Sequence, residues 1–227
     1  MIKITYLVMV YNEVKTVKKA IQDVIDIKYK NKEILVIDNG STDGSQNVIK
    51  KFKNIKKILR KKNLGAGKTI AEGIKKAKGN YIFIQFSDLE YDHLKSLDML
   101  NYAIKNKLDI VLGSRLKNKN IWKELLKKKS YLATIITTFA VNKFYDKNFT
   151  DIIGAKLYKT TEVRKIPINS YGPGFDWEFI SRACKRNLKI GEVSIKYKPR
   201  FYQNEKKIKF YNIFNAIFEL TKVKLFE

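Results

Sequence analysis

The sequence predicts an α/β fold with a mostly parallel, doubly wound central sheet. The chain has 227 residues, of which 44% are apolar, enough for one continuous core and too few for two well-developed ones. Apolar runs of strand length alternate with segments of helical period along the first hundred residues, and the connections between them are short. This alternation favours parallel strands with helices on both faces, in a single domain over residues 1–227.

The predicted strands of the first half are apolar runs bounded by polar or glycine residues. In chain order they span residues 4–11, 33–38, 56–60, 81–86 and 108–112. Between them, apolar residues recur three or four positions apart, which is the spacing of one helix face. These segments predict helices around residues 17–25, 48–52 and 65–76. A sheet of this kind binds its ligands beyond the carboxyl ends of its strands.

The pattern changes after residue 115. Residues 117–148 form a basic, mixed stretch of largely helical period, and short strands follow around residues 154–158. A helix is predicted from about Phe175 to Arg186, and a final strand over residues 190–197. Because no linker rich in proline or serine interrupts the chain, the elaborated second half belongs to the same domain.

The charge balance favours a polyanionic partner. The 47 Lys and Arg against 22 Asp and Glu give a net charge of +25, which attracts nucleic acid, phosphorylated substrates or an anionic membrane. Part of this charge is also expected to be solvated surface in a composition rich in Lys, Ile and Asn. The basic run from Lys50 to Lys62 has no interleaved aromatic residues and no zinc spacing. Nucleic acid is therefore not the expected partner.

Cysteine usage and hydropathy indicate a cytoplasmic protein. Cys184 is the only cysteine, which excludes a disulfide scaffold and fits a reducing compartment. The apolar start of the chain lacks a small-residue cleavage site. The later apolar stretch at residues 131–141 is shorter than the roughly 20 residues that a membrane-spanning helix needs.

The C-terminal segment, residues 210–227, predicts an amphipathic helix with lysines beside its apolar face. The apolar residues on that face are Phe210, Ile213, Phe214, Ile217 and Phe218. Two interpretations are open. The helix either lies at the inner face of a membrane as a peripheral contact or packs on its own domain.

Two phosphate-binding motifs are excluded. Gly67-Lys68-Thr69 resembles the end of a Walker loop, but Lys62 stands where that loop needs its first glycine. Ile70 stands where a dinucleotide fingerprint needs its third glycine.

The acidic residues are more informative because they follow the predicted strands. Glu13 follows the first strand, Asp38 ends the second, and Asp88 and Glu90 follow the strand at residues 81–86. Carboxyl ends of parallel strands share one edge of a sheet. A group of carboxylates at that edge suits a divalent cation bound to a diphosphate.

Short motifs spread over nearly the whole chain form an ordered set. The first four are Val10-Tyr11-Asn12-Glu13, Val36 to Gly44, Asn63 to Gly67, and Gln85 to Asp92. The later three are Gly113-Ser114-Arg115, Gly174 to Glu178, and Pro199 to Ile208. The first four resemble family 2 glycosyltransferases, which have a nucleotide-sugar-binding fold of the GT-A type, a Rossmann-like architecture. The later three are similar to the dolichyl-phosphate mannosyltransferase branch of that family.

The resemblance implies a division of the domain. Residues 1–115 would bind the nucleotide sugar, residues 116–209 would bind the acceptor, and residues 210–227 would form the amphipathic helix.

The resemblance also implies roles on the donor side. Tyr11, Glu13 and Asp38 would line the nucleoside pocket, and Gly65 would belong to the same nucleotide-sugar site. Carboxylates suit such a pocket because they accept hydrogen bonds from a base N–H or a ribose hydroxyl. Asp88, with Glu90, would hold Mg²⁺ or Mn²⁺ on the donor diphosphate and so help the diphosphate to leave.

One residue departs from the family pattern. The family usually has aspartate at both ends of a D-x-D triplet, and Phe86 stands in the first place. Since hard cations need several oxygen ligands, Asp88 would depend on the diphosphate and water for the rest. Metal dependence is therefore an open question.

On the acceptor side, basic residues resemble the positions that receive a phosphate. These are Arg115, Arg200, Lys206 and Lys207, and an arginine offers such a group a bidentate fork. Alternatively, Arg115 fixes the loop after its strand.

A general base is needed only for a hydroxyl acceptor, because a phosphate is already anionic. Asp176 and Glu178 are the candidates, with Asp151 behind them. Two residues two positions apart on a helix point to nearly opposite sides, and we expect Asp176 to face the site.

The expected function is an inverting glycosyltransferase that moves a sugar from a nucleotide-sugar donor to a polyprenyl, dolichyl-like phosphate. One alternative acceptor is a saccharide hydroxyl in surface polysaccharide synthesis. A second alternative is a catalytically silent nucleotide-sugar-binding protein.

Overall fold

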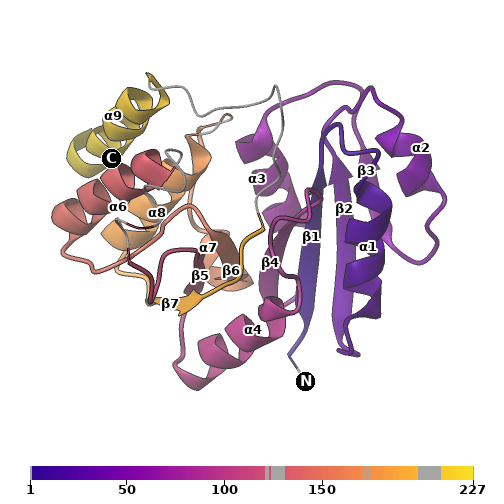
Figure 1. Cartoon of the computed structure of the whole chain (residues 1–227), viewed down its shortest axis with the longest axis horizontal. Coiled ribbons are helices and arrows are strands. Elements are labelled where there is room, and N and C mark those ends of the chain that lie inside the picture. Colours follow the sequence, from indigo (N-terminus) through magenta and orange to yellow (C-terminus); the bar gives the residue numbers. More distant parts are fainter. Residues whose placement is uncertain are drawn as a thin grey trace.

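The computed structural model describes residues 2–120, 123, 131–170, 172, 174–198 and 211–226. Within these residues seven strands form one sheet in the order β3-β2-β1-β4-β6-β5-β7 (Figure 1). The strands are β1 (Ile4–Val10), β2 (Lys32–Asp38), β3 (Lys56–Leu59), β4 (Tyr81–Phe86), β5 (Ile110–Ser114), β6 (Ala155–Lys159) and β7 (Ile190–Ser194). The predicted α/β class with a mostly parallel sheet is confirmed.

Strand β6 is the exception to the parallel arrangement. It lies between β4 and β5 and pairs with both in the antiparallel sense, while the other strand pairs are parallel. The start of β6 therefore lies at the same edge as the carboxyl ends of β4 and β5. This reversal brings residues near Gly154 close to the end of β4.

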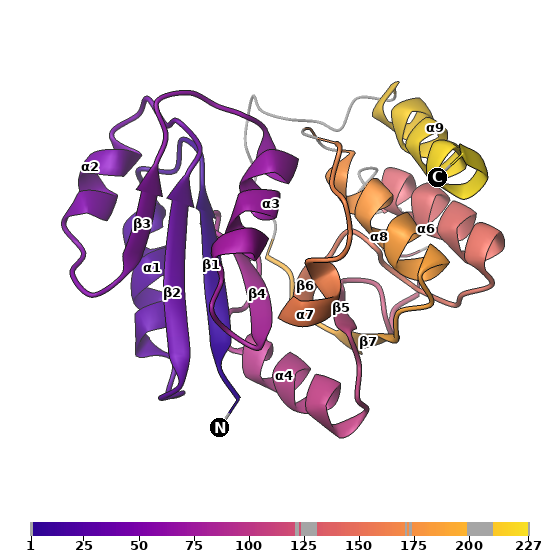
Figure 2. The same cartoon turned by 180° about the vertical axis from the view of Figure 1, so that it is seen from behind.

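Helices cover both faces of the sheet (Figures 1 and 2). Helices α1 (Val17–Asp26), α2 (Ser45–Lys50) and α4 (Lys95–Lys105) pack on one face. The other face carries α3 (Ala66–Lys76), α6 (Tyr131–Tyr145), α7 (Thr160–Val163), α8 (Phe175–Lys185) and α9 (Tyr211–Phe226). The three layers make a doubly wound arrangement.

Strand β1 explains why the two cores form. All seven of its residues are buried, and alternate side chains of a strand point to opposite faces. Tyr6 and Val8 join the core under α1, whereas Leu7 and Met9 join the core under α3. A strand buried on both faces has to be a continuous apolar run, which is the pattern of this segment.

Helix α9 has one face buried against its own domain and another face that exposes apolar side chains. Ala216, Leu220 and Val223 are fully or almost fully buried, where α9 contacts α6 and α8. The helix therefore packs on its own domain. Phe218 and Leu225, each 66% exposed, leave an apolar outer face. Among the described helices, none has both the length and the apolar character needed to cross a bilayer.

Candidate functional site

The loops after β1 and β2 are tied together at the carboxyl edge of the sheet. The Asn12 amide donates to Ser41 Oγ at 2.9 Å, and the Thr42 amide donates to Asn12 Oδ1 at 2.9 Å. The Val14 amide donates to Asp43 Oδ2 at 2.8 Å. Because these side chains satisfy backbone groups of the neighbouring loop, the two loops form one rigid wall.

Asp38 stabilises the loop after β2 from the buried side. Its side chain is fully buried and accepts hydrogen bonds from the amides of Gly40 and Ser41 at 3.0 and 2.9 Å. Gln46 Nε2 adds a third bond at 2.6 Å. Asp38, which the resemblance assigns to the nucleoside pocket, thus lies at the expected edge of the sheet with its carboxylate hydrogen-bonded within its own loop.

Tyr11 and Glu13 lie closer to the surface of the same wall. Tyr11 directly follows β1 and is 37% exposed. Glu13 is half-buried and its Oε2 accepts a hydrogen bond from Thr16 Oγ1 at 2.9 Å. Both residues lie beyond the end of β1, as predicted for Glu13, whereas the predicted strand had included Tyr11.

Gly65 begins helix α3 in a conformation that suits glycine. Its φ is +88°, a value that side chains with a Cβ rarely adopt. The loop before it is held by Asn39, whose Oδ1 accepts from the Leu64 amide at 3.0 Å and from Arg60 Nη1 at 2.9 Å. The loops after β2 and β3 are thus joined, with Gly65 at their junction.

The loop after β4 carries the acidic pair Asp88 and Glu90. The Glu90 amide donates to Asp88 Oδ1 at 3.1 Å, and Tyr197 Oη donates to Glu90 Oε2 at 2.9 Å. The Lys198 amide also donates to the Glu90 carbonyl at 2.9 Å. The segment after β7 therefore holds this loop in place.

The described side chains at this edge offer few ligands for a cation. Among the described residues, no three His, Cys, Asp or Glu side chains form a group able to hold a metal ion. Glu13, Asp38 and Asp88 thus share the edge of the sheet without forming a preassembled metal site. Asp88 and Glu90 offer hard carboxylate oxygens, so a cation would fit here only with further ligands from a bound diphosphate and water.

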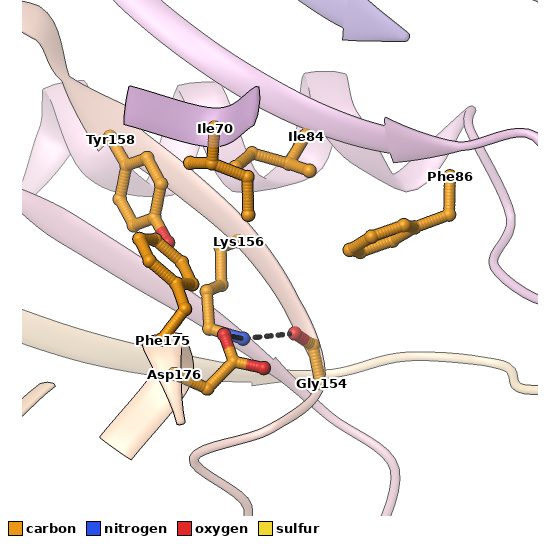
Figure 3. A pocket seen from close by; sticks show the side chains of 8 residues that line it. All are labelled: Ile70, Ile84, Phe86, Gly154, Lys156, Tyr158, Phe175 and Asp176. Carbon is orange, nitrogen blue, oxygen red and sulfur yellow. Dashed lines mark hydrogen bonds and ion pairs between the residues drawn. The ribbon is translucent and has the colours of Figure 1, made fainter. Parts of the chain in front are cut away.

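A small pocket lies on the α3 side of the sheet, between β4, β6 and α8 (Figure 3). One side of it is apolar, with Ile70, Ile84, Phe86 and Phe175. The other side is polar, where Figure 3 places the Lys156 ammonium beside the Asp176 carboxylate. Phe86, the residue that departs from the D-x-D pattern, is therefore a wall of this pocket.

Asp176 faces the pocket and Glu178 does not. Asp176 lies in the first turn of α8 with a side chain that is 27% exposed, and Lys156 Nζ approaches its Oδ1 to 2.7 Å. Glu178 is 2% exposed. Its carboxylate accepts bonds from the Asn169 amide at 2.9 Å and the Ser170 amide at 2.6 Å. Glu178, the second carboxylate predicted to be catalytic, thus holds the loop before α8.

Arg115 is likewise used inside the fold. It is 8% exposed, and its Nε and Nη2 donate to Asp151 at 2.7 and 3.0 Å. Its guanidinium also lies over the rings of Tyr131 and Tyr197. An acceptor phosphate would have to break the Asp151 pair to bind here. These contacts agree with the alternative interpretation, in which Arg115 fixes the loop after β5.

The pKa of Asp151 reflects this pairing. Burial raises the pKa of the Asp151 carboxyl. The charge and hydrogen bonds of Arg115 lower this pKa by more than burial raises it, so the net pKa lies below its ordinary value. Asp151 therefore stays ionised, and its full burial keeps it out of reach of an acceptor hydroxyl. The predicted acceptor residues Arg200 and Lys206, with Lys207, lie outside the described residues.

Lys156 and Tyr158 were missed by the sequence reasoning. Both lie on β6 and line the pocket with Gly154. The signal was the period of two in Gly154-Ala155-Lys156-Leu157-Tyr158, which places the three alternate residues on one face of a strand. Burial raises the pKa of Tyr158 well above its ordinary value, so its hydroxyl stays neutral.

The sequence matches a known family over most of its length. The model of the family described as glycosyl transferase family 2 matches residues 5–166. The chain belongs to glycosyl transferase family 2. The match includes β1 to β6 and every donor-side residue predicted above, while α8 with Asp176 follows it. The dolichyl-phosphate mannosyltransferase-like branch is not distinguished by this match.

Two bacterial relatives share one name. The poly-β-1,6-N-acetyl-D-glucosamine synthase of Staphylococcus epidermidis is 28% identical over 205 residues, which cover 87% of this chain and 48% of that protein. The synthase of the same name from Staphylococcus aureus (strain COL) is 32% identical over 126 residues, covering 52% of this chain and 30% of that protein. The chain thus spans about half the length of the first relative and less of the second.

Solved structures agree on the fold. Glucosyl-3-phosphoglycerate synthase from Mycobacterium tuberculosis, in complex with Mn²⁺ and UDP-glucose, matches with a TM-score of 0.72 at 13% identity. The match covers 99% of this chain and 78% of that one. The complex of the same enzyme with Mn²⁺, UDP and glucosyl-3-phosphoglycerate matches with a TM-score of 0.70 at 14% identity. These matches support the GT-A-type architecture of the sheet and its helices.

Proposed function

We propose that this protein is an inverting glycosyltransferase that moves a sugar from a nucleoside diphosphate donor to a saccharide hydroxyl. The observation that carries the proposal is the Asp176 carboxylate, which is partly exposed in the pocket at the end of β4. A hydroxyl loses its proton as it attacks the anomeric carbon, and a carboxylate within reach can accept that proton. Attack would come from the side opposite the departing diphosphate, which inverts the anomeric configuration.

The donor side is supported by the loops at the carboxyl edge. Tyr11 and Glu13 border the wall where a nucleoside would bind, and Asp88 lies at the end of β4 where its diphosphate would lie. A divalent cation on that diphosphate would neutralise the charge that builds on the leaving group. Asp88 would hold it, with Glu90 kept nearby by Tyr197. The structural neighbours that carry Mn²⁺ and UDP support this assignment.

The acceptor side favours a hydroxyl over a phosphate. Arg115, the arginine predicted to receive a phosphate, is paired with Asp151. A phosphate acceptor would also make the carboxylate of Asp176 unnecessary and repel it. The names of the two relatives, poly-β-1,6-N-acetyl-D-glucosamine synthases, support a saccharide acceptor in polysaccharide synthesis. Transfer to a polyprenyl phosphate remains the competing outcome of the test.

The test compares donors and acceptors directly. The protein is incubated with UDP-N-acetylglucosamine or UDP-glucose, and either β-1,6-linked N-acetylglucosamine oligomers or a short polyprenyl phosphate is added. Release of UDP and mass of the product are measured. Extension of the oligomers supports the proposal. Exclusive transfer to the polyprenyl phosphate rejects the saccharide acceptor, and binding of donor without turnover supports a silent protein.

The metal assignment predicts the result of changing Asp88. We expect Asp88→Asn to lower the turnover with Mn²⁺ by about a hundredfold, because an amide is a poor ligand for a hard cation. We also expect Mn²⁺ to raise the melting temperature of the wild type with UDP, and to have little effect on the variant. Thermal shift with and without Mn²⁺ measures this. Equal Mn²⁺ effects on both proteins would exclude Asp88 as the ligand.

A peripheral membrane contact is part of the proposal. The outer face of α9 exposes Ile217, Phe218 and Leu225, and the chain carries a net charge of +25. An apolar helix face on a basic protein suits an anionic lipid surface. The surface of a membrane would also bring the enzyme close to a growing surface polysaccharide.

The expected result is retention on vesicles that contain phosphatidylglycerol and not on vesicles of phosphatidylcholine alone. Phe218→Asp should lower that retention about tenfold or more, since it places a charge on the apolar face. Lys19→Gln, which also lowers the net charge by one, changes an exposed side chain of α1; it is the control and should lower retention less. Sedimentation with vesicles measures both. No binding by the wild type at low salt would reject the membrane contact.

A further inference from the structure

The pocket contains a lysine whose role the proposed mechanism has not used. Lys156 lies on β6, and its side chain is only 5% exposed. A buried lysine loses favourable hydration of its ammonium, so it needs close polar partners. Its Nζ donates to the carbonyls of Ile153 and Gly154 at 3.1 and 3.0 Å. Its third contact is Asp176 Oδ1 at 2.7 Å.

The carbonyl anchors make the ammonium a fixed point. Gly154 packs so closely against β5 that an added Cβ would lie 1.9 Å from the Gly113 carbonyl oxygen. Both carbonyls belong to the turn that leads into β6, and Asp151 accepts the amides of Ile153 and Gly154 at 3.0 and 3.1 Å. The backbone that binds Lys156 is therefore itself held by buried bonds.

Asp176 has little else in the pocket to hold it. The other lining side chains are apolar, apart from the neutral hydroxyl of Tyr158. That hydroxyl has no hydrogen-bond partner among the described residues. Of the residues that line the pocket, Lys156 alone carries a positive charge. Without this contact the carboxylate would be free to rotate away from the end of β4.

We infer that Lys156 is a positioning residue, which fixes the carboxylate of Asp176 in the orientation that accepts the proton of the acceptor hydroxyl. The inference rests on the proposed function. The ion pair between Lys156 and Asp176 joins the antiparallel strand β6 to the first turn of α8. Small displacements of a reacting group lower the rate about a hundredfold, so the effect should be on turnover and not on donor binding.

The test uses substitutions of Lys156 in the full chain. Lys156→Met keeps the length of the side chain and removes the charge. We expect it to lower kcat for transfer from UDP-N-acetylglucosamine to the oligomer acceptor by about 10- to 100-fold. KM for the donor should stay within about threefold, because the proposed mechanism gives Lys156 no contact with the donor. Lys156→Arg should recover part of the lost kcat, since it restores the charge in a different shape.

A matched control lies on the same strand. Lys159 pairs with Asp109 at 3.3 Å, at the end of β6 away from the pocket. Lys159→Met removes an ion pair from β6 in the same way and should leave kcat unchanged. Melting temperature and UDP binding of each variant are measured beside the kinetics, so that lost folding is separated from lost positioning.

A double-mutant cycle with Asp176→Asn gives the decisive comparison. If Lys156 acts through Asp176, the double variant should be no slower than Asp176→Asn by more than about twofold. Multiplied losses in the double variant, or an unchanged kcat in folded Lys156→Met, would overturn the inference while the wild type still transfers sugar. If the wild type transfers sugar from no donor, the proposed function fails first.

Discussion

Replacing Asp176 by asparagine is expected to lower kcat for transfer to a saccharide hydroxyl by two to three orders of magnitude. General-base catalysis contributes about 10²- to 10⁴-fold, and an amide of the same shape cannot accept the proton. In the proposed mechanism the donor binds through its diphosphate and nucleoside, so KM for the donor should change little. Steady-state release of UDP with the oligomer acceptor measures both constants.

Asp109→Asn is the matched control for this prediction. Asp109 pairs with Lys159 as Asp176 pairs with Lys156, but at the other end of β6. The control should retain wild-type turnover. If Asp176→Asn also retains it, Asp176 is not the base. A loss restricted to hydroxyl acceptors, with transfer to polyprenyl phosphate preserved, would agree with the proposed role, since a phosphate needs no base.

Asp151→Asn is expected to destabilise the fold by about 3–5 kcal/mol, the usual cost of removing one charged partner from a buried ion pair. Asp151 is fully buried and accepts bonds from the backbone amide, Nε and Nη2 of Arg115. The substitution leaves the buried guanidinium without a counter-charge. Urea unfolding of the variant and the wild type measures the difference. Asp98→Asn, which removes an exposed pair with Lys95, should change stability by no more than about 0.5 kcal/mol.

The same residue predicts a pH dependence. The pKa of Asp151 is lowered in the folded protein, since Arg115 outweighs the effect of burial. A lowered folded pKa contributes stability that is fully present above the unfolded value of about 3.9 and is lost as pH falls through the folded value. The wild type should therefore lose more stability than Asp151→Asn on acidification below about pH 4. Parallel losses in both proteins would contradict the prediction.

Much of the fold was predictable because its signals are local. Strand β1 is buried on both faces and reads as an unbroken apolar run, and helix α3 starts at a glycine after a polar loop. Helical geometry predicts that only one of Asp176 and Glu178 faces the site, and the choice of Asp176 rested on its place near the start of the helix. Carboxylates at the carboxyl edge were predicted from parallel strands, although Asp38 proved to be buried in its own loop.

The remainder depends on contacts between distant parts of the chain. The short strand β6 has no local pattern that gives its direction, and its insertion between β4 and β5 decides what lines the pocket. The Arg115–Asp151 pair joins residues 36 positions apart, so the sequence left the role of Arg115 open. Helix α4 was also not predicted, although its buried residues Met99, Leu100 and Ala103 recur at helical spacing.

The direction of β6 also limits how this protein can evolve. Alternate residues of the strand serve different layers: Ala155 and Leu157 belong to the core under α1 and α4, while Lys156 and Tyr158 line the pocket. A single inserted or deleted residue before this strand would exchange the two sets and bury the lysine in hydrocarbon. Length variation among homologues should therefore be absent between Asp151 and Lys159, and should accumulate in segments that carry no alternating pattern.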